Sequence, residues 1–307
     1  MSVVSTDDLS GGFLENVPKQ STWVKGDLTS AEFVAGLWRE HGPFDYVYHL
    51  GAYAAEGLSH FIRAYNYRTN LVASMHVLNE AIKSKTCRCF VFASSIAVYG
   101  QGQVPMTEDM IPQPEDPYGI SKYAVELDLH AARGMFGTDY IVFRPHNVYG
   151  ERQNIADKYR NVIGIFMNQL MQGKPMSVFG DGLQTRAFSH VDDVAPIIAR
   201  SPLVPAAYNR VYNIGADTPY TVLQLAQEIA DAFGKPRDVV HLPARNETVH
   251  AFSDHSRVRE AFGHTTAVDL RTGIRRMAEW VKSRGPATPV RFSNIEIRER
   301  LPAGWET

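Results

Sequence analysis

Short apolar runs alternate with amphipathic stretches along the first half of the chain. The apolar runs cover residues 44–50, 89–94 and 140–144, and the amphipathic stretches cover 70–83 and 119–133. In the amphipathic stretches, apolar side chains recur at three- and four-residue spacing, which predicts helices with one buried face. The order strand, helix, strand, helix, strand is typical of a doubly wound parallel sheet, so we expect an α/β fold.

The pattern becomes less regular after Gly150. A helix is predicted at 162–171, and a strand at 211–214 is placed to return to the main sheet. We therefore expect residues 1–150 to form a Rossmann-like domain. Residues 151–307 should mainly form a smaller substrate-binding region, with some segments returning to the main sheet.

Composition excludes several classes of protein. The 307 residues are 44% hydrophobic and 21% charged, and the formal net charge is −2. No global positive field exists to attract nucleic acid or anionic lipid. The first residues lack the features of a signal peptide, no apolar run approaches a membrane span, and metal-ligand spacings are missing. Cys87 and Cys89 indicate packing rather than a disulfide, so the sequence predicts a cytoplasmic protein without membrane or nucleic-acid partners.

The strongest chemical signal is a tyrosine four residues before a lysine, Tyr118 and Lys122. On a helix these side chains share one face, and a nearby ammonium is expected to lower the pKa of the phenol toward that of a working base. The structural alternative is a helix start without a catalytic role. The apolar run before Ser95 places this hydroxyl at a strand's carboxyl end, where ligands bind in open α/β sheets. Ser95 can then hydrogen-bond the same substrate oxygen as Tyr118.

Three motifs carry a family resemblance: FVFASSIAVYG, DPYGISKYAVE and FRPHNVYG. Together they resemble the extended short-chain dehydrogenases of the NAD-dependent epimerase/dehydratase type, and most of all the UDP-glucose 4-epimerases. The likeness extends over almost the whole chain. It implies a Rossmann-like fold, NAD as cofactor, and Ser95, Tyr118 and Lys122 as catalytic residues.

The resemblance also implies the residues that hold NAD. Asp7 is expected to accept the hydroxyls of the adenosine ribose. The other implied cofactor residues are Asp8, Ser10, Gly11, Asp27, Leu28, Leu50, Gly51, Ala52, Asn70, Ala93, Ser94, Tyr118, Lys122, Pro145 and His146.

Several of these positions have a structural alternative. Asp7, Asp8 and Ser10 can form a simple turn, and Asp27 can be a helix cap. Asn70 can be a buried amide bonded to backbone. His146 is expected to be a contact residue rather than a base.

The implied partner is a UDP-sugar. The positions that match its binding residues are Ser95, Asn147, Asn161, Phe179, Arg186 and Arg245. Two arginines suit a diphosphate because a guanidinium presents its donors in a fork that matches phosphate oxygens. The resemblance further implies a homodimer formed through the helices at 70–83 and 121–133.

The sequence departs from the family at its start. No first strand precedes Asp7, and no G-x-x-G-x-x-G turn, which would hold the NAD pyrophosphate, occurs in the chain. Either the given start omits a segment, or the dinucleotide site is damaged. Because Asp7, Ser95, Tyr118 and Lys122 are intact, we favour an omitted segment.

Two side chains bear on the type of reaction. Dehydratases of the family carry an Asp-Glu pair directly after the Ser/Thr, whereas Ile96 and Ala97 stand here and neither can transfer a proton. We therefore expect C4 epimerisation of UDP-glucose and UDP-galactose, or of a related UDP-hexose, by transient oxidation with NAD. The alternatives are a non-catalytic nucleotide-sugar-binding paralogue and another NAD-dependent nucleotide-sugar enzyme, such as a dehydratase or reductase.

Overall fold

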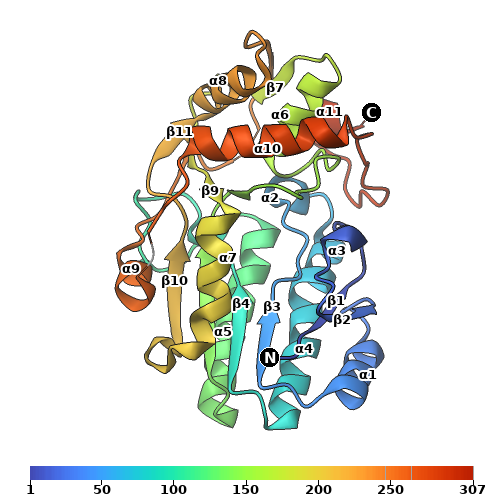
Figure 1. Ribbon diagram of the computed structural model, residues 1–307, viewed down its shortest axis with the longest axis vertical. Helices are drawn as coiled ribbons and strands as arrows, with labels where there is room; N and C mark the ends of the chain where they lie inside the picture. Colours follow the sequence, from blue (N-terminus) through green and yellow to red (C-terminus); the bar gives the residue numbers. More distant parts are fainter. Residues whose placement is uncertain (246, 264, 307) are drawn as a thin grey trace.

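A parallel four-stranded sheet forms the centre of the larger half of the molecule (Figure 1). The computed structural model describes residues 1–245, 247–263 and 265–306. Its strand order is β10-β5-β4-β3. The strands are β3 (Tyr46–His49), β4 (Cys89–Ala93), β5 (Tyr140–Pro145) and β10 (Arg210–Ile214). The strands predicted from the apolar runs are confirmed, and the strand at 211–214 does return to this sheet.

Helices cover both faces of the sheet. On one face lie α1 (Ala31–His41), α4 (Ala73–Ser84) and α5 (Pro117–Phe136); on the other lie α7 (Val191–Arg200) and α9 (Ser256–Phe262). Alternate residues of β4 point to opposite cores: Phe90 and Phe92 join the α4 and α5 side, and Cys89 and Val91 join the α7 side. This alternation is the period-two pattern of a strand that is buried on both faces. The predicted doubly wound α/β fold is confirmed.

The first two strands form a sheet of their own. Strands β1 (Val4–Asp7) and β2 (Thr22–Lys25) pair in parallel and lie beside β3 in Figure 1. Within the described ranges, no hydrogen-bonded pairing joins β1 to β3. The edge of β3 is partly open, and Tyr48 is 40% exposed. The interruption falls where the sequence predicted that the sheet lacks a strand.

The smaller half lies beyond the carboxyl ends of the main strands (Figure 1). Its core is built on α6 (Val162–Met171), α8 (Val222–Phe233) and α10 (Leu270–Arg284). Three small sheets accompany these helices. One pairs β7 (Met176–Phe179) with β12 (Val239–Leu242), and a second has the order β11 (Pro219–Thr221), β8 (Thr185–Ala187), β13 (His250–Ala251). The third pairs β6 (Val148–Tyr149) with β9 (Ser189–His190). The helix predicted at 162–171 is confirmed, whereas the domain division at residue 150 stays a prediction.

Short helical turns complete the connections. They are α2 (Glu56–Ser59), α3 (Arg63–Tyr67), α11 (Ala303–Glu306), the 3-10 turns η1 (Leu14–Asn16), η3 (Ile96–Tyr99), η4 (Ser201–Leu203) and η5 (Pro205–Ala207), and the π-helical turn η2 (Arg68–Val72). None of the helices in the described part of the chain has the length and apolar character needed to cross a bilayer.

A buried ion pair joins α5 to β5. The Glu126 carboxylate accepts two hydrogen bonds from the Arg144 guanidinium, at 3.0 Å and 2.5 Å. Both side chains are almost fully buried, and the Ser94 hydroxyl donates to the same carboxylate. A pair like this is stabilising only while it is complete, because a single buried charge keeps the cost of leaving water.

Removing one partner should therefore be costly. We expect Glu126→Gln to lower the free energy of unfolding by about 3–5 kcal/mol, because Arg144 stays buried without a counter-charge. Urea unfolding followed by circular dichroism measures this. The matched control is Glu80→Gln, whose partner Lys83 is 69% exposed; we expect a loss below about 1 kcal/mol there. Equal losses in the two variants would contradict the role of the buried pair.

Candidate active site

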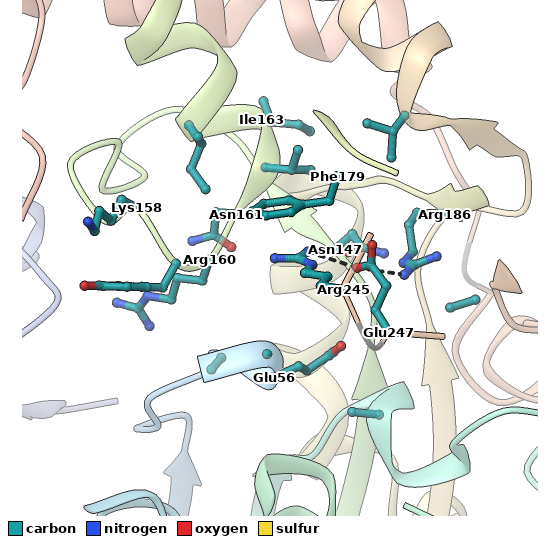
Figure 2. Close-up of a pocket in the computed structure, with 18 of the residues that line it drawn as sticks. Glu56, Asn147, Lys158, Arg160, Asn161, Ile163, Phe179, Arg186, Arg245 and Glu247 are labelled. Atoms are coloured by element: carbon teal, nitrogen blue, oxygen red, sulfur yellow. Dashed lines mark hydrogen bonds and ion pairs between the residues drawn. The ribbon is translucent and has the colours of Figure 1, made fainter. Parts of the chain in front are cut away.

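A cavity of about 970 Å³ lies between the carboxyl ends of β4 and β5 and the smaller half of the molecule. Figure 2 shows part of its lining. The sequence-predicted site residues that line it are Ser94, Ser95, Tyr118, Pro145, His146, Asn147, Asn161, Phe179, Arg186 and Arg245. All of the predicted substrate residues thus meet in one place, together with four of the predicted cofactor residues, Ser94, Tyr118, Pro145 and His146.

The first turn of α5 positions Tyr118. The Asp116 side chain caps the helix by accepting the Gly119 amide at 2.9 Å, and Pro117 follows at the first helical position. Gly119 packs so closely that a Cβ there would lie 2.5 Å from the carbonyl oxygen of Ala97. The helix start is therefore pressed against the segment that follows Ser95, as the close approach of a glycine permits.

Ser95 and Tyr118 are brought together as predicted. Both are buried and line the cavity, and the Ser95 hydroxyl acts to lower the pKa of Tyr118. The Ser95 hydroxyl also accepts the Ala97 amide at 3.1 Å, which fixes its rotamer as the cap of η3. Two hydroxyls therefore converge on one end of the cavity.

Lys122 lies behind the tyrosine, one helical turn along. Its Nζ donates to the carbonyl oxygen of Ala93 at 2.8 Å and lies 5.9 Å from the centre of the Tyr118 ring. The Phe92 ring is nearer, at 4.8 Å. The residue is 2% exposed and does not line the cavity.

The predicted effect of Lys122 on the Tyr118 pKa is wrong for the protein alone. Burial raises the pKa of Tyr118, and the negative charge of Glu56 raises it further, while the Ser95 hydrogen bond acts in the opposite direction. Burial also lowers the pKa of Lys122 to about 7, against the pull of Glu126. Desolvation disfavours both charged forms, so it outweighs the attraction expected from helical spacing.

The two predicted arginines face each other across a glutamate. Glu247 lies 2.9 Å from Arg245 and 3.5 Å from Arg186 (Figure 2). Arg186 also donates to the carbonyl oxygens of Thr185 and Val249. Arg245 stacks on Phe179, with its guanidinium carbon 4.6 Å from the ring centre. The Nε atom of Arg245 is buried without a hydrogen-bond partner. The Arg245 guanidinium can therefore still donate a hydrogen bond to an anionic ligand.

Two asparagines bend the chain into the cavity. Asn147 has φ 41° and Asn161 has φ 64°, in the left-handed region that asparagine tolerates better than most residues. The Asn147 amide donates to the carbonyl oxygen of Ala187 at 3.1 Å. Both residues line the cavity beside Arg245 in Figure 2.

The remaining predicted cofactor residues lie outside the cavity. They are Asp7, Asp8, Ser10, Gly11, Asp27, Leu28, Leu50, Gly51, Ala52, Asn70, Ala93 and Lys122. Asp7 accepts the Leu9 amide at 2.6 Å and Asp8 accepts the Ser10 amide at 2.7 Å, so the turn proposed as an alternative is present.

Two of these residues are occupied by the protein itself. Asp27 accepts the amide and hydroxyl of Thr29 at 2.8 Å each, while Ser30 caps α1, so the helix-cap interpretation of Asp27 is wrong. Asn70 is fully buried and bonds the backbone of Tyr53 and the side chain of Asn66. That arrangement matches the structural alternative for Asn70.

The residues present fit one end of NAD better than the other. Ser94, Ser95, Tyr118 and Pro145 surround cavity space where a nicotinamide ring can approach the hydroxyl pair. At the adenosine end, Asp7 offers an exposed carboxylate at the carboxyl end of β1. Between these ends, no glycine-rich loop presents backbone amides in residues 1–245, 247–263 or 265–306.

Sequence reasoning missed three charged residues. Glu56, Arg160 and Glu247 all line the cavity. Burial raises the pKa of Glu56 to about 7, with Asp116 adding to the shift. Arg160 is held by Asp157 at 2.8 Å and lies against Gly11, so it stands between the adenosine edge and the cavity. Arg160 and Glu247 belong to irregular segments and Glu56 begins the short helix α2, so no long helical or strand spacing marks a site there.

Comparison with known proteins identifies the family. The NAD dependent epimerase/dehydratase family matches residues 1–215. This chain belongs to that family, as the three motifs predicted. It is 31% identical over 290 residues to a UDP-glucose 4-epimerase of Mycolicibacterium smegmatis, covering 92% of this chain and 91% of that protein.

Two solved structures are similar over most of their length. The UDP-glucose 4-epimerase of Thermotoga maritima with UDP-glucose superimposes with a TM-score of 0.85 at 30% identity, covering 92% of this chain and 91% of that chain. The UDP-glucose 4-epimerase of Thermus thermophilus in complex with NAD gives a TM-score of 0.82 at 28% identity, covering 90% and 89%. The Rossmann-like fold and NAD as the cofactor of the family agree with the predictions.

The pKa of Lys122 can be tested through stability. A free lysine has a pKa of about 10.4, whereas burial lowers that of Lys122 to about 7. Between about pH 7 and pH 10 the unfolded chain therefore binds more protons at this residue, and stability rises with pH. Relative to Lys122→Met, the wild type should gain at least about 1.4 kcal/mol across this window, equivalent to one pKa unit. Urea midpoints at several pH values measure the difference. The exposed Lys83→Met serves as control, and the same slope for both would contradict the shift.

Proposed function

We propose that this protein is an NAD-dependent nucleotide-sugar 4-epimerase that acts on UDP-glucose and UDP-galactose or a related UDP-hexose. The observation that carries the proposal is that a pair of hydroxyl groups and a pair of guanidinium groups line one cavity. The hydroxyls of Ser95 and Tyr118 line the same cavity as the guanidinium groups of Arg186 and Arg245. A hydroxyl pair suits oxidation of a sugar carbon, and an arginine pair suits a diphosphate.

In the proposed reaction, Tyr118 accepts the proton of the sugar C4 hydroxyl as hydride leaves C4, and it returns that proton to the C4 oxygen when hydride is delivered to the opposite face of the 4-keto sugar. Ser95 holds the reacting oxygen. The hydrogen bond to the Ala93 carbonyl oxygen keeps the Lys122 ammonium 5.9 Å from the centre of the Tyr118 ring, where it can stabilise the phenolate. When bound, NAD supplies the hydride acceptor and a positive charge beside the phenol. Because burial raises the Tyr118 pKa in the protein alone, the proton is held until that charge is in place.

A dehydratase is the second candidate, since dehydratases also occur among the relatives. Ile96 and Ala97 line the cavity next to Ser95 and cannot transfer a proton. Glu56, however, supplies a carboxyl group to the same cavity from a different segment, with its pKa raised by burial to about 7. Elimination would release water and give a 4-keto-6-deoxy sugar, whereas epimerisation inverts C4 and keeps every atom of the sugar.

Replacing the phenol tests the catalytic proposal. We expect Tyr118→Phe to lower the rate of UDP-glucose and UDP-galactose interconversion by about 10²- to 10⁴-fold, the usual contribution of acid–base catalysis. The assay adds NAD and identifies the product by chromatography, so it also detects a 4-keto-6-deoxy product. Tyr123→Phe, on the same helix, is the matched control and should keep its rate. Undiminished turnover in Tyr118→Phe would remove Tyr118 as the base.

The arginine pair can be tested by binding alone. Arg245→Met should weaken UDP binding by about 10- to 100-fold, equivalent to one charge-assisted hydrogen bond. Glu247→Gln should tighten it, because the Glu247 carboxylate occupies the same donors. Isothermal titration with UDP, without NAD, measures both. If Glu247→Gln weakened binding as Arg245→Met does, the diphosphate would not bind between these arginines.

A further inference from the structure

Two buried histidines meet ring to ring beneath the cavity. The Nε2 atoms of His146 and His255 lie 3.0 Å apart, and the rings are 3% and 0% exposed. His146 follows β5 and lines the cavity, while His255 precedes α9. Two imidazole nitrogens at this distance form a hydrogen bond only if one carries a proton and the other a lone pair.

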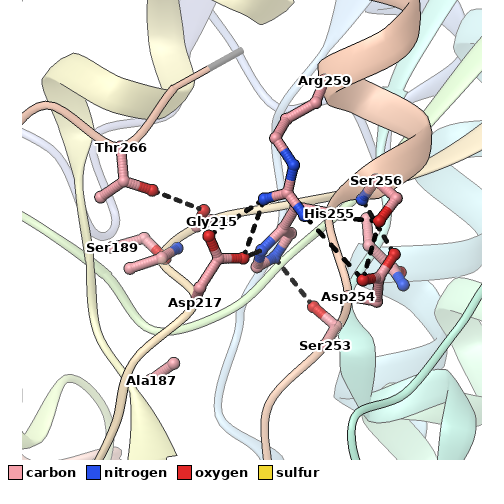
Figure 3. Close-up of polar contacts among 12 residues, drawn as sticks. Ala187, Ser189, Gly215, Asp217, Ser253, Asp254, His255, Ser256, Arg259 and Thr266 are labelled. Carbon is pink, nitrogen blue, oxygen red and sulfur yellow. Dashed lines mark hydrogen bonds and ion pairs between the residues drawn. The ribbon is translucent and has the colours of Figure 1, made fainter.

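The nearest groups at the outer ends of the histidine pair are a carbonyl and a carboxylate oxygen, which can only accept; the Ser189 hydroxyl lies farther from Nδ1 of His146, at 3.4 Å. Nδ1 of His146 lies 3.0 Å from the carbonyl oxygen of Ala187. Nδ1 of His255 lies 2.7 Å from the carboxylate of Asp217 (Figure 3). From these nearer contacts we assign a proton to each Nδ1.

Asp217 is held in its charged form. Arg259 donates to both of its oxygens, at 3.1 Å and 3.0 Å. Burial would raise the pKa of Asp217, but the hydrogen bonds from His255 and Arg259 outweigh it and lower the pKa. The carboxylate is thus an acceptor and not a source of the proton on His255.

Counting protons fixes the charge of the pair. The two rings make three contacts in a row: Ala187 with His146, His146 with His255, and His255 with Asp217. Each contact needs one proton, two on the outer Nδ1 atoms and one between the Nε2 atoms, so the two rings together carry three protons. Two neutral imidazoles carry only two. Burial, and then the neighbouring His255, lower the pKa of His146 to about 3, so His146 is the neutral ring.

We infer that His255 is a permanently protonated imidazolium that donates to both Asp217 and His146, and that it holds His146 as a positioning residue rather than a base. His146 is then the Nδ1–H tautomer, and its Nε2 lone pair is occupied. Ser253 provides a second acceptor 3.1 Å from Nε2 of His255. Among the described residues, Arg259 also pairs with Asp217 and lies 3.9 Å from Asp254.

The surroundings are shaped for this contact. A Cβ at Gly215 would lie 2.5 Å from Nε2 of His146, so only glycine leaves room for the two rings to meet. The row of groups joins the segment after β5, the strand β8, the end of β10 and the start of α9. Asn147 directly follows His146 and donates to the same Ala187 oxygen. The histidine pair therefore fixes the segment that presents Asn147 to the cavity. That Asn147 contacts a substrate there rests on the proposed function.

Histidine protonation can be read directly. Full-length protein with ¹⁵N-labelled histidine is studied by one-bond ¹⁵N–¹H spectroscopy at pH 8, above the pKa of a free imidazole of about 6.5. His255→Gln and His146→Gln assign the signals. We expect two protonated nitrogens on His255, and one protonated Nδ1 with a bare Nε2 on His146. A bare nitrogen on His255 would overturn the inference. Because no substrate is added, the result does not depend on epimerase activity.

Removing the counter-charge gives a second, independent readout. In Asp217→Asn, we expect His255 to lose one of its two N–H signals at pH 8. Asp254→Asn is the matched control, because Asp254 bonds Ser256 and not His255, and should leave the pattern unchanged. If Asp217→Asn keeps both signals, Asp217 does not hold the charge and the inference fails. If that variant does not fold, the wild-type spectrum still decides.

Discussion

The ion pair between Glu126 and Arg144 is the contact on which the active site depends. Glu126 lies one helical turn after Lys122 on α5, and Arg144 directly precedes the segment that carries His146 and Asn147. The same carboxylate accepts the hydroxyl of Ser94, beside Ser95. One buried charge pair therefore ties together the three main-chain segments that carry the hydroxyl pair, the lysine and the substrate contacts. Their relative positions are fixed because breaking the pair would leave a charge without water or partner.

Burial also decides the chemistry of the cavity before any ligand binds. It raises the pKa of Tyr118 and lowers that of Lys122, so the isolated protein holds a phenol and a weakly basic amine rather than a charged pair. The cavity is lined by more basic than acidic residues: Lys158, Arg160, Lys174, Arg186, Arg245 and Arg291 against Glu56, Glu115, Asp116 and Glu247. The cavity thus favours an anionic ligand, and the arrival of charge is what can shift the acid–base groups toward reaction.

The sequence predicted the regular parts well and the irregular parts poorly. Periodicity located the main strands and α6, because buried strands and amphipathic helices leave a repeated apolar pattern. The motifs brought Ser95, Tyr118, Arg186 and Arg245 to one cavity. Spacing did not reveal Glu247 between the arginines, nor did it reveal the partner of His146, which lies more than a hundred residues away in the sequence. The catalytic roles, the domain division and the homodimer stay predictions.

The two ends of the site depend on different parts of the molecule. The hydroxyl pair and the arginine pair rest on the main sheet beyond β3 and on the smaller half, each with its own packed core. Asp7 instead rests on β1, whose only hydrogen-bonded strand in the described part of the chain is β2. Strain or motion of the β1–β2 pair would therefore change the adenosine end without moving Tyr118 or Arg245. Under the proposed function, the sugar nucleotide and the dinucleotide would therefore rest on separately supported parts of the site, and UDP affinity would report on the arginine pair alone.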